Sequence, residues 1–374
     1  MSLPRPGGHA VSPDKRLNAA TLPLAEWAPR PQLRVRTTPV PQPRYPAIDI
    51  HNHLGRWLSG GNWRTGTAPW LIDDVHRFID LLDESGVEAV VNLDGMWGAE
   101  LDANLGRYDR AFPGRIHTFC QLDWEQLAEP DGVARLKRSL ARSAGQGAVG
   151  LKVWKSLGLT IRDSDGTLIL PDDARVAEVL AEAGQLGLPV LIHVADPIAF
   201  FEPLDRHNER LDELGQAPEW WFGDRSVHPS FDRLVDALSA LLESAPGTTF
   251  IGAHAGCAAE DLDRVDRMLA QHPNFTIDIA GRMAELGRQP RRVKRLIEKH
   301  PDRVLFGTDI YPATAEQYAL HYRFLESDDE SFEYDPDSLI PGQGRWNVSA
   351  LALQARLLEP LYRGNARRVL GLNT

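Results

Sequence analysis

The sequence is poor in cysteine, has no excess of basic residues and contains no long apolar run. Its two cysteines, Cys120 and Cys257, stand far apart among 374 residues, so a disulfide framework is not indicated. Lysine and arginine together number 41 against 52 aspartates and glutamates, an acidic balance that argues against a nucleic-acid partner. No stretch of about 18 consecutive apolar residues exists, so no transmembrane helix is expected. What remains is the composition of a soluble globular protein, 43% hydrophobic and 25% charged.

The first 45 residues are rich in proline and arginine and show little periodicity. The run PVPQPRYP at residues 39–46 cannot be helical, because proline lacks the amide hydrogen and its ring clashes with the preceding turn. We therefore expect an extended N-terminal arm over residues 1–45, followed by one domain over residues 46–374. The arm lacks the charged-then-apolar pattern of a signal peptide, and together with the low cysteine content this favours a cytoplasmic protein.

From residue 46 onward, short apolar runs alternate with stretches of helical periodicity. Eight runs predict strands, at residues 47–52, 88–94, 115–123, 148–154, 189–196, 248–254, 274–280 and 303–309. Amphipathic stretches predict helices at residues 70–86, 103–113, 132–145, 172–187, 230–246, 259–273, 289–301 and 351–372. The runs are apolar on both faces, as buried parallel strands are. Several helical stretches reach a glycine that suits a helix end, namely Gly86, Gly145 and Gly187.

Eight successive strand–helix units predict a (β/α)8 TIM barrel. An open doubly wound sheet is the competing fold, but no glycine-rich phosphate or dinucleotide motif between a strand and a helix supports it. Two connections are long, residues 197–229 after the fifth strand and residues 310–347 after the eighth. Both leave from the face on which barrel enzymes carry their sites, and such loops are typical of lids or binding loops. Their aromatic residues favour a pocket with aromatic walls, with a surface excursion or subunit contact as the alternative.

Polar side chains end several of the predicted strands. His51 and His53 close the first strand, where positions two apart point to the same side. Strands four, five, six and eight end in Lys152, His193, His254 and Asp309. A lone strand histidine is more often a packed core residue, but in a barrel all of these side chains would meet at one mouth. Imidazole and carboxylate donors suit zinc, and also manganese or iron, and such a metal lowers the pKa of a bound water to about 7.

The motifs DIHNHL, GLKVW, LIHVADP, IGAHAG and LFGTDIYP follow one another along the chain. Together they resemble the amidohydrolase superfamily, in particular the amidohydrolase-2 subgroup that includes aminocarboxymuconate-semialdehyde decarboxylase, resorcylate-type decarboxylases and lactonases. The resemblance covers residues 46–372. It implies one divalent metal, zinc in the first place, held by His51, His53, His193 and Asp309. It also implies that His254 acts as an acid or base beside the metal, and that Asp309 both ligates the metal and accepts a proton.

Lys152 leaves two arrangements open. In binuclear relatives the corresponding lysine is carbamylated and bridges two metals, and His254 would then be a ligand of the second ion. In mononuclear members a lysine at this place binds a substrate carboxylate or stays unmodified, and one ion is the favoured expectation. Arg56 and Trp57 on the first loop, and Arg282 after the seventh strand, are further candidates for substrate binding.

Four other charged residues near strand ends are expected to have supporting roles. Asp49 precedes His51 by two positions, so strand alternation places both on one face and Asp49 is expected to orient the His51 ring. Asp94 is expected to serve a turn or a helix cap. Asp196 is expected to cap the turn before a proline, and Lys155 to lie at the surface or anchor a loop.

Three functions fit these residues. The first is a metal-dependent hydrolase that opens an amide, lactone or ester of a small molecule, the second a nonoxidative decarboxylase or hydratase on the same metal site, and the third a non-catalytic metal-binding barrel. A decarboxylase needs cations for carboxylates, whereas a hydrolase of a neutral substrate would leave Arg56 and Arg282 in salt bridges. We favour the hydrolase because hydrolysis predominates in the superfamily. No membrane partner is expected, and the resemblance suggests a homodimer.

Overall fold

The computed structural model describes residues 20–60 and 62–372. Within them eight parallel strands form two ladders. The first contains β1 (Ala47–Asn52), β2 (Val87–Asn92) and β3 (Ile116–Thr118). The second contains β4 (Leu151–Val153), β5 (Val190–Ile192), β6 (Phe250–Gly252), β7 (Phe275–Asp278) and β8 (Val304–Leu305).

Backbone hydrogen bonds join the two ladders at both edges. The amide of Lys152 donates to Cys120 O over 2.8 Å between β4 and the end of β3, and the amide of Ile50 donates to Phe306 O over 3.0 Å between β1 and the end of β8. The eight strands therefore follow one another around a barrel in sequence order. This confirms the predicted (β/α)8 fold.

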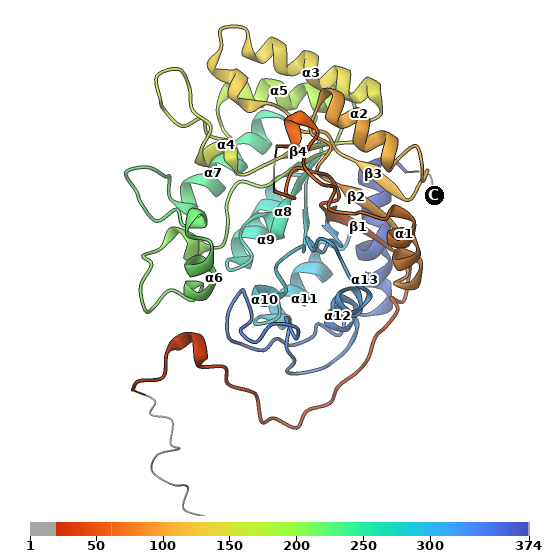
Figure 1. Ribbon diagram of the computed structural model, residues 1–374, viewed down its shortest axis with the longest axis vertical. Helices are drawn as coiled ribbons and strands as arrows, with labels where there is room; N and C mark the ends of the chain where they lie inside the picture. The colour runs from red at the N-terminus through yellow and green to blue at the C-terminus, as the bar shows by residue number, and fades with distance from the viewer. Residues whose placement is uncertain (1–19, 61, 373–374) are drawn as a thin grey trace, which may run out of the picture.

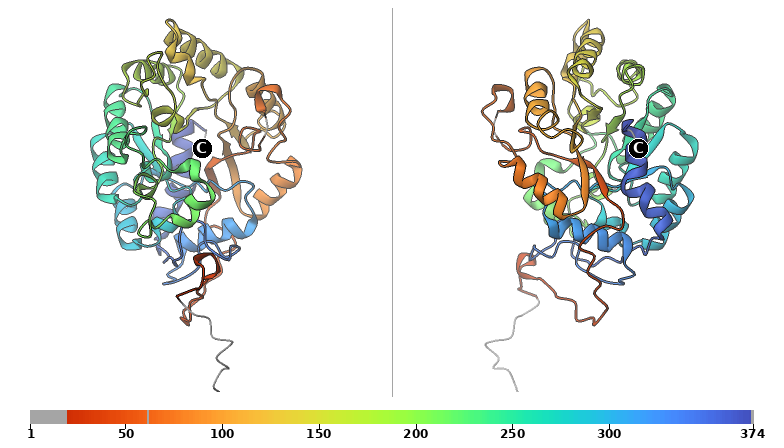
Figure 2. Two further views of the ribbon diagram at one scale, coloured as in Figure 1. Left: turned by 60° about the vertical axis from the view of Figure 1, so that its left-hand side comes forward. Right: turned by 90° about the vertical axis from the view of Figure 1, so that its right-hand side faces the viewer.

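The helices form the outer layer around these strands (Figures 1 and 2). The longer ones are α1 (Val75–Glu84), α2 (Gly98–Arg107), α3 (Gly132–Gln146), α5 (Ala174–Gln185), α7 (Phe231–Ser244), α9 (Leu262–Gln271), α11 (Pro290–Lys299) and α12 (Ala315–Glu326). Shorter ones are α4 (Ser156–Leu159), α6 (Leu211–Gln216), α8 (Ala253–Gly256), α10 (Met283–Leu286), α13 (Ala355–Glu359) and α14 (Asn365–Leu370), with a π-helical turn at Pro360–Gly364 between the last two. No helix among the described residues has the length and apolar character needed to cross a membrane.

Two apolar cores hold the barrel together. A small cluster inside the strands includes Ile50, Val91, Leu191 and Ile251, all fully buried. A much larger cluster lies between the strands and the surrounding helices. Each fully buried aliphatic side chain contributes about 1.5–3 kcal/mol, so these cores fix the strand ends rigidly.

The connection after β8 is long, as predicted, but its first part is a helix rather than a loop. α12 begins at a capping box, in which the Thr314 hydroxyl accepts from the Gln317 amide and the Gln317 side chain accepts from the Thr314 amide. Tyr318 and Tyr322 on this helix are buried in the core instead of lining a pocket. The T-x-x-Q spacing is the sequence signal that identifies this helix start.

Thr314→Ala is expected to lower the free energy of unfolding by about 1 kcal/mol, because it leaves a first-turn amide of α12 without its acceptor. Chemical denaturation of the purified variant measures this loss. Thr314→Ser keeps the hydroxyl and should unfold like the wild type. Equal destabilisation by both substitutions would contradict a capping role.

Two of the three glycines expected at helix ends lie there. Gly86 and Gly187 follow α1 and α5 with φ of 70° and 71°, a left-handed conformation that glycine adopts without strain. α3, in contrast, continues past Gly145 and ends at Gly147, whose φ is 116°. The helix therefore extends one residue beyond the predicted stretch, to Gln146.

The described part of the predicted N-terminal arm, residues 20–45, runs as an extended segment below α12 and is hydrogen-bonded to its own chain (Figure 1). The amide and hydroxyl of Thr38 both donate to the buried carboxylate of Asp329 over 2.8 Å. The Arg345 guanidinium donates to the carbonyls of Leu24 and Trp27. Residues 1–19, the start of the predicted arm, lie outside the described residues.

Candidate metal centre and active site

Three histidines from two regions of the chain surround one carboxylate at the mouth of the barrel. Asp309 Oδ1 lies 3.6 Å from His51 Nε2 and 3.4 Å from His53 Nε2, both at the end of β1. Asp309 Oδ2 lies 3.8 Å from Nε2 of His254, which follows β6. The structure thus brings together four of the residues that the sequence pattern singled out.

Each β1 histidine is held at its other ring nitrogen by a buried carboxylate. His51 Nδ1 lies 2.8 Å from Asp278 Oδ2, and His53 Nδ1 lies 2.6 Å from Asp94 Oδ1. A carboxylate at Nδ1 holds a proton there, so Nε2 is the nitrogen that remains for a metal. Both Nε2 atoms face Asp309. Asp94 therefore orients a site histidine, and its expected role in a turn or helix cap is wrong.

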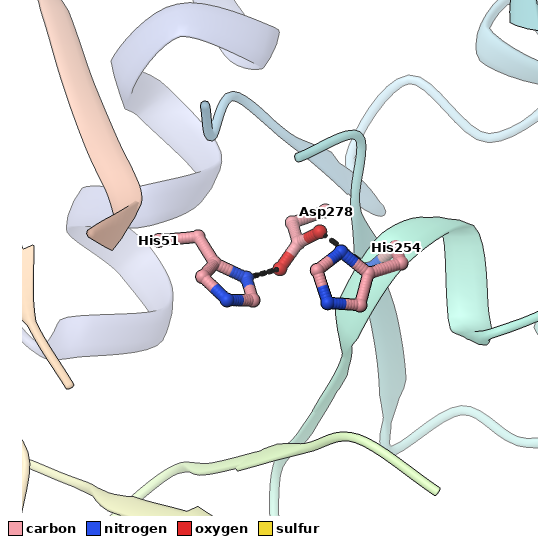
Figure 3. Close-up of side chains that lie close together, drawn as sticks. All are labelled: His51, His254 and Asp278. Carbon is pink, nitrogen blue, oxygen red and sulfur yellow. Dashed lines mark hydrogen bonds and ion pairs between the residues drawn. The ribbon is translucent and has the colours of Figure 1, made fainter. Parts of the chain in front are cut away.

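Asp278 supports two histidines at once (Figure 3). Its Oδ2 binds the His51 ring, while its Oδ1 accepts from the backbone amide of His254 over 2.7 Å. The His254 ring is oriented separately, because its Nδ1 lies 2.8 Å from the carbonyl of Ala280. A single carboxylate at the end of β7 therefore sets the spacing between the β1 and β6 sides of the site.

The backbone is strained at two of these residues. Asp309 and His254 have φ of 56° and 58°, in the left-handed region that side chains other than glycine rarely adopt. Such residues cost about 1–3 kcal/mol each and persist where the surroundings hold them. The amide of Asp309 donates to His51 O over 2.9 Å, and the amide of His254 to Asp278. Strain concentrated at converging polar groups indicates a functional site.

The fourth candidate ligand, His193, follows β5 and lines the same cavity. Its ring centroid lies 4.5 Å from that of His254. Among the described residues its buried Nδ1 has no hydrogen-bond partner, and its Nε2 lies 3.3 Å from Asp196 Oδ1 without hydrogen-bond alignment. Burial lowers the pKa of His193 to about 4, so the ring is neutral at physiological pH.

This donor set fits a divalent metal ion. The ligand atoms of His51, His53 and Asp309 all lie within 4.8 Å of one another. Three oriented imidazole nitrogens, a carboxylate and an unpartnered buried nitrogen on His193 are the donors that zinc, manganese and iron accept.

Local charges set the protonation states around the site. Burial lowers the pKa of His53, but the carboxylates of Asp94 and Asp309 outweigh it and raise the pKa to about 9. Burial, reinforced by the charge of Arg282, holds the pKa of His254 well below its ordinary value. Burial raises the pKa of Asp309, but the neighbouring histidines bring it below the usual range. At neutral pH Asp309 is therefore ionised and His254 is neutral, so both can accept a proton.

Lys152 lies at the floor of the site, as the sequence predicts. Its Nζ is fully buried and 3.5 Å from His51 Nε2. Burial lowers its pKa to about 8, because the desolvated ammonium loses stability relative to the amine. No carboxylate lies within ion-pair distance of Lys152 in the described part of the chain. The amine form is nucleophilic, which is compatible with either an unmodified lysine or a carbamate.

A cavity of about 670 Å³ opens above these residues. Its walls include the aromatic rings of Trp154, Phe200, Trp220 and Tyr311. Arg282 also lines it and is only 8% exposed, yet its guanidinium donates to its neighbour's carbonyl and has no carboxylate within ion-pair distance among residues 20–60 and 62–372. Glu213 and Glu260 lie near enough for their charges to interact with Arg282, but neither contacts its guanidinium, so the guanidinium is free to bind an anion in the cavity.

Arg56 and Trp57 are not part of the group of side chains that surrounds Asp309. The Arg56 guanidinium pairs with Glu100 through two nitrogens and stacks 4.5 Å from the Trp70 ring, so it is bound within the protein and does not line the cavity. The Trp57 ring lies 6.5 Å from that of His53 and packs edge-on against Trp154, with the two ring centroids 4.8 Å apart. The structure therefore places Trp57 beside the site and Arg56 outside it.

Asp49 does not orient the His51 ring, contrary to expectation. Its carboxylate accepts from the amide and hydroxyl of Thr308, over 3.0 and 2.6 Å, and from Tyr318 on α12. The pairing of β1 with β2 shifts register between Asp49 and Asn52, so strict alternation does not relate Asp49 to His51. Asp49 instead holds Thr308, the residue that precedes Asp309, in place.

The sequence analysis missed Asp278, which holds both His51 and His254. A signal was present, because Asp278 is the one charged residue in the apolar run NFTIDIA. The rule that identified the other residues, a polar side chain near the carboxyl end of a buried strand, applies to it equally.

Comparisons with known proteins show the family and the fold of this chain. The family model for amidohydrolases matches residues 48–372. Among solved structures, 2,6-dihydroxybenzoate decarboxylase from Rhizobium is 17% identical, with a TM-score of 0.54 over 88% of this chain and 100% of that chain. A zinc-containing amidohydrolase from Burkholderia multivorans is 16% identical, with a TM-score of 0.51 over 87% and 99% of the two chains.

A third similar structure is a dihydroxybenzoic acid decarboxylase from a Polaromonas species with bound manganese and the inhibitor 2-nitroresorcinol. It is 17% identical, with a TM-score of 0.53 over 88% of this chain and 98% of that chain. No curated protein matches the sequence. At these identities the solved structures establish a common fold.

Proposed function

Because this chain belongs to the amidohydrolase family, we propose that it is a metal-dependent hydrolase of a small anionic molecule. Family membership makes it an enzyme, which removes the non-catalytic barrel from consideration. The observation that carries the proposal is the convergence of His51, His53 and His254 on Asp309 below the cavity.

In this proposal His51, His53, His193 and Asp309 hold one divalent ion. The similar structures with zinc and manganese support either metal, and zinc is the first choice. When bound, the ion supplies Lewis-acid chemistry and lowers the pKa of water. Asp309, ionised at neutral pH, accepts the water's proton. His254, neutral and with its Nε2 3.8 Å from Asp309, takes that proton over from Asp309 and then passes it to the leaving group.

Arg282 binds the anionic group of the substrate in this proposal, since it lines the cavity and no carboxylate lies within ion-pair distance of its guanidinium among the described residues. Arg282→Gln is expected to raise KM about 10- to 100-fold, because a charge-assisted hydrogen bond contributes about 1.5–3 kcal/mol. Steady-state kinetics measure this change. Arg56→Gln is the matched control and should leave KM close to the wild-type value. A KM unchanged by Arg282→Gln would contradict the anion site.

Nonoxidative decarboxylation of an aromatic carboxylic acid is the second candidate. Two unpaired cations, Arg282 and Lys152, favour it, because each can hold a carboxylate or phenolate while the aromatic walls stack on a planar ring. In that reaction His254 or Asp309 delivers the proton to carbon.

Isotope incorporation distinguishes the two reactions. Purified enzyme loaded with zinc or manganese is incubated with hydroxybenzoic acids, aryl lactones and N-acyl amino acids, first in ¹⁸O-labelled water and then in D₂O. Hydrolysis places solvent oxygen in the product, whereas decarboxylation places deuterium on carbon and releases carbon dioxide. Loss of carbon dioxide with deuterium and no ¹⁸O would overturn the hydrolase in favour of the second candidate.

Metal content tests the number of ions. Plasma mass spectrometry on protein purified without chelator is expected to give about one ion per chain, unchanged in Lys152→Ala. Two ions that fall to one in the variant would indicate a carbamylated Lys152 and overturn the single-ion site. Cytoplasmic location and a homodimer stay proposals, which cell fractionation and light scattering test.

A further inference from the structure

Two charged residues of the cavity wall have no role in the proposed reaction. Lys155 follows β4 and Asp196 follows β5, and both are nearly buried, with 9% and 5% of their surfaces exposed. The Lys155 ammonium donates to Asp196 Oδ2 and lies 4.8 Å from the centroid of the Trp220 ring. Of the two expected roles of Lys155, the surface position is wrong, and its ion pair with Asp196 joins the segments after β4 and β5 as a loop anchor would.

The second oxygen of Asp196 faces a candidate metal ligand. Asp196 Oδ1 lies 3.3 Å from His193 Nε2. The other three site histidines each have one ring nitrogen held by an oxygen, from Asp278, Asp94 or a backbone carbonyl. His193 lacks such a partner unless Asp196 supplies it.

We propose that Asp196 is a positioning residue for His193 and that Lys155 positions Asp196. The inference rests on the proposed metal site. Asp196 Oδ1 accepts the proton of His193 Nε2, so His193 offers Nδ1 to the metal. The three other histidines have the opposite arrangement, with Nδ1 held and Nε2 free. Lys155 binds the remaining oxygen, which fixes the carboxylate plane and compensates its buried charge.

The contacts of the two Asp196 oxygens distinguish this arrangement from a purely structural ion pair. A purely structural ion pair needs only the contact between Lys155 and Asp196. Here the carboxylate lies between the ammonium and the imidazole, so each oxygen faces a different side chain. The lysine is enclosed by the Trp154 and Trp220 rings, 5.6 and 4.8 Å from its Nζ, which limits its alternative positions.

Zinc affinity tests the proposal directly, through competition with a coloured chelator on the purified full chain. Asp196→Asn is expected to weaken zinc binding about 10- to 100-fold, as is typical when the partner of a metal-bound histidine is lost. The new amide turns its oxygen to the Lys155 ammonium and its NH₂ group to His193, where a donor meets a donor. The unfolding midpoint of the apo variant, measured alongside, separates this effect from loss of fold.

Lys155 should act on the metal only through Asp196. Lys155→Met is expected to weaken zinc binding several-fold, and Lys155→Arg to restore most of it. The double variant Lys155→Met with Asp196→Asn should bind zinc as weakly as Asp196→Asn alone, because neighbouring residues in one chain of contacts are not additive. Additive losses would overturn the proposed order of contacts.

Asp329→Asn is the matched control, since Asp329 is also a buried carboxylate paired with a cation, Arg323, but lies outside the cavity. It should lower stability without changing zinc affinity. Wild-type zinc affinity in Asp196→Asn would overturn this inference while leaving the proposed function intact. A wild-type chain that binds no zinc or manganese would overturn both.

Discussion

Asp309→Asn is expected to abolish turnover almost completely while the barrel stays folded. Asp309 is the group on which His51, His53 and His254 converge, and its loss removes both a metal ligand and a proton acceptor. Loss of a positioned base alone reduces rate by about 10²–10⁴-fold. Asparagine suits the position sterically, because it tolerates the left-handed backbone that Asp309 adopts with φ of 56°.

Turnover of whichever test compound the wild type converts, together with zinc content, measures this effect. The backbone bond from residue 309 to His51 O is unaffected by the substitution, so the unfolding midpoint should change little. Asp109→Asn offers a control, since it also removes a carboxylate, here a half-buried one bonded to Thr118 away from the cavity. Turnover within a few-fold of wild type in Asp309→Asn would remove Asp309 from the mechanism.

Asp278→Asn is expected to weaken metal binding strongly, although Asp278 is not itself one of the proposed metal ligands. Asp278 is fully buried and accepts from the His51 ring, from the His254 amide over 2.7 Å and from the Ala280 amide over 3.1 Å. An amide NH₂ group in place of one oxygen faces a donor, and each buried polar group left unsatisfied costs about 1–3 kcal/mol. We expect zinc affinity to fall about 10- to 100-fold and stability to fall as well.

Two readouts separate these consequences. Zinc competition reports the orientation of His51, and denaturant unfolding reports the lost backbone contact at His254. Asp278→Glu keeps the charge but displaces the oxygens by a methylene group, so it should retain more stability than metal affinity. If Asp278→Asn bound zinc as the wild type does, the His51 tautomer would not depend on Asp278.

Much of the barrel was predictable from local pattern. The run at residues 47–52 coincides with β1, and each of the eight apolar runs overlaps an observed strand, because buried parallel strands must be apolar on both faces. The fifth, sixth and eighth strands end earlier than their runs, so His193, His254 and Asp309 lie beyond the hydrogen-bonded ladder. Helix α12 was missed because its aromatic residues were assigned to a loop, although the capping-box spacing was present.

The roles of the carboxylates were not predictable in this way. Asp94 is 41 residues from His53 and Asp278 is 227 residues from His51 in sequence, so no local spacing relates them. Local rules assigned Asp94, Asp196 and Lys155 to turns and surfaces, where such residues are common. At the barrel mouth these three residues are buried, so each contacts a side chain from a distant segment of the chain and not solvent or its own turn.

The sequence by itself determined the order of strands and helices, and which imidazole and carboxylate groups stand near the carboxyl ends of the strands. Both depend on periodicity and burial, which act over a few neighbouring residues. Only the tertiary structure decided which nitrogen of each histidine is free, that Asp49 supports the backbone before Asp309, and that Arg56 is paired while Arg282 is not. Those properties depend on contacts between distant segments, because the pKa and orientation of a buried group are set by the charges packed against it.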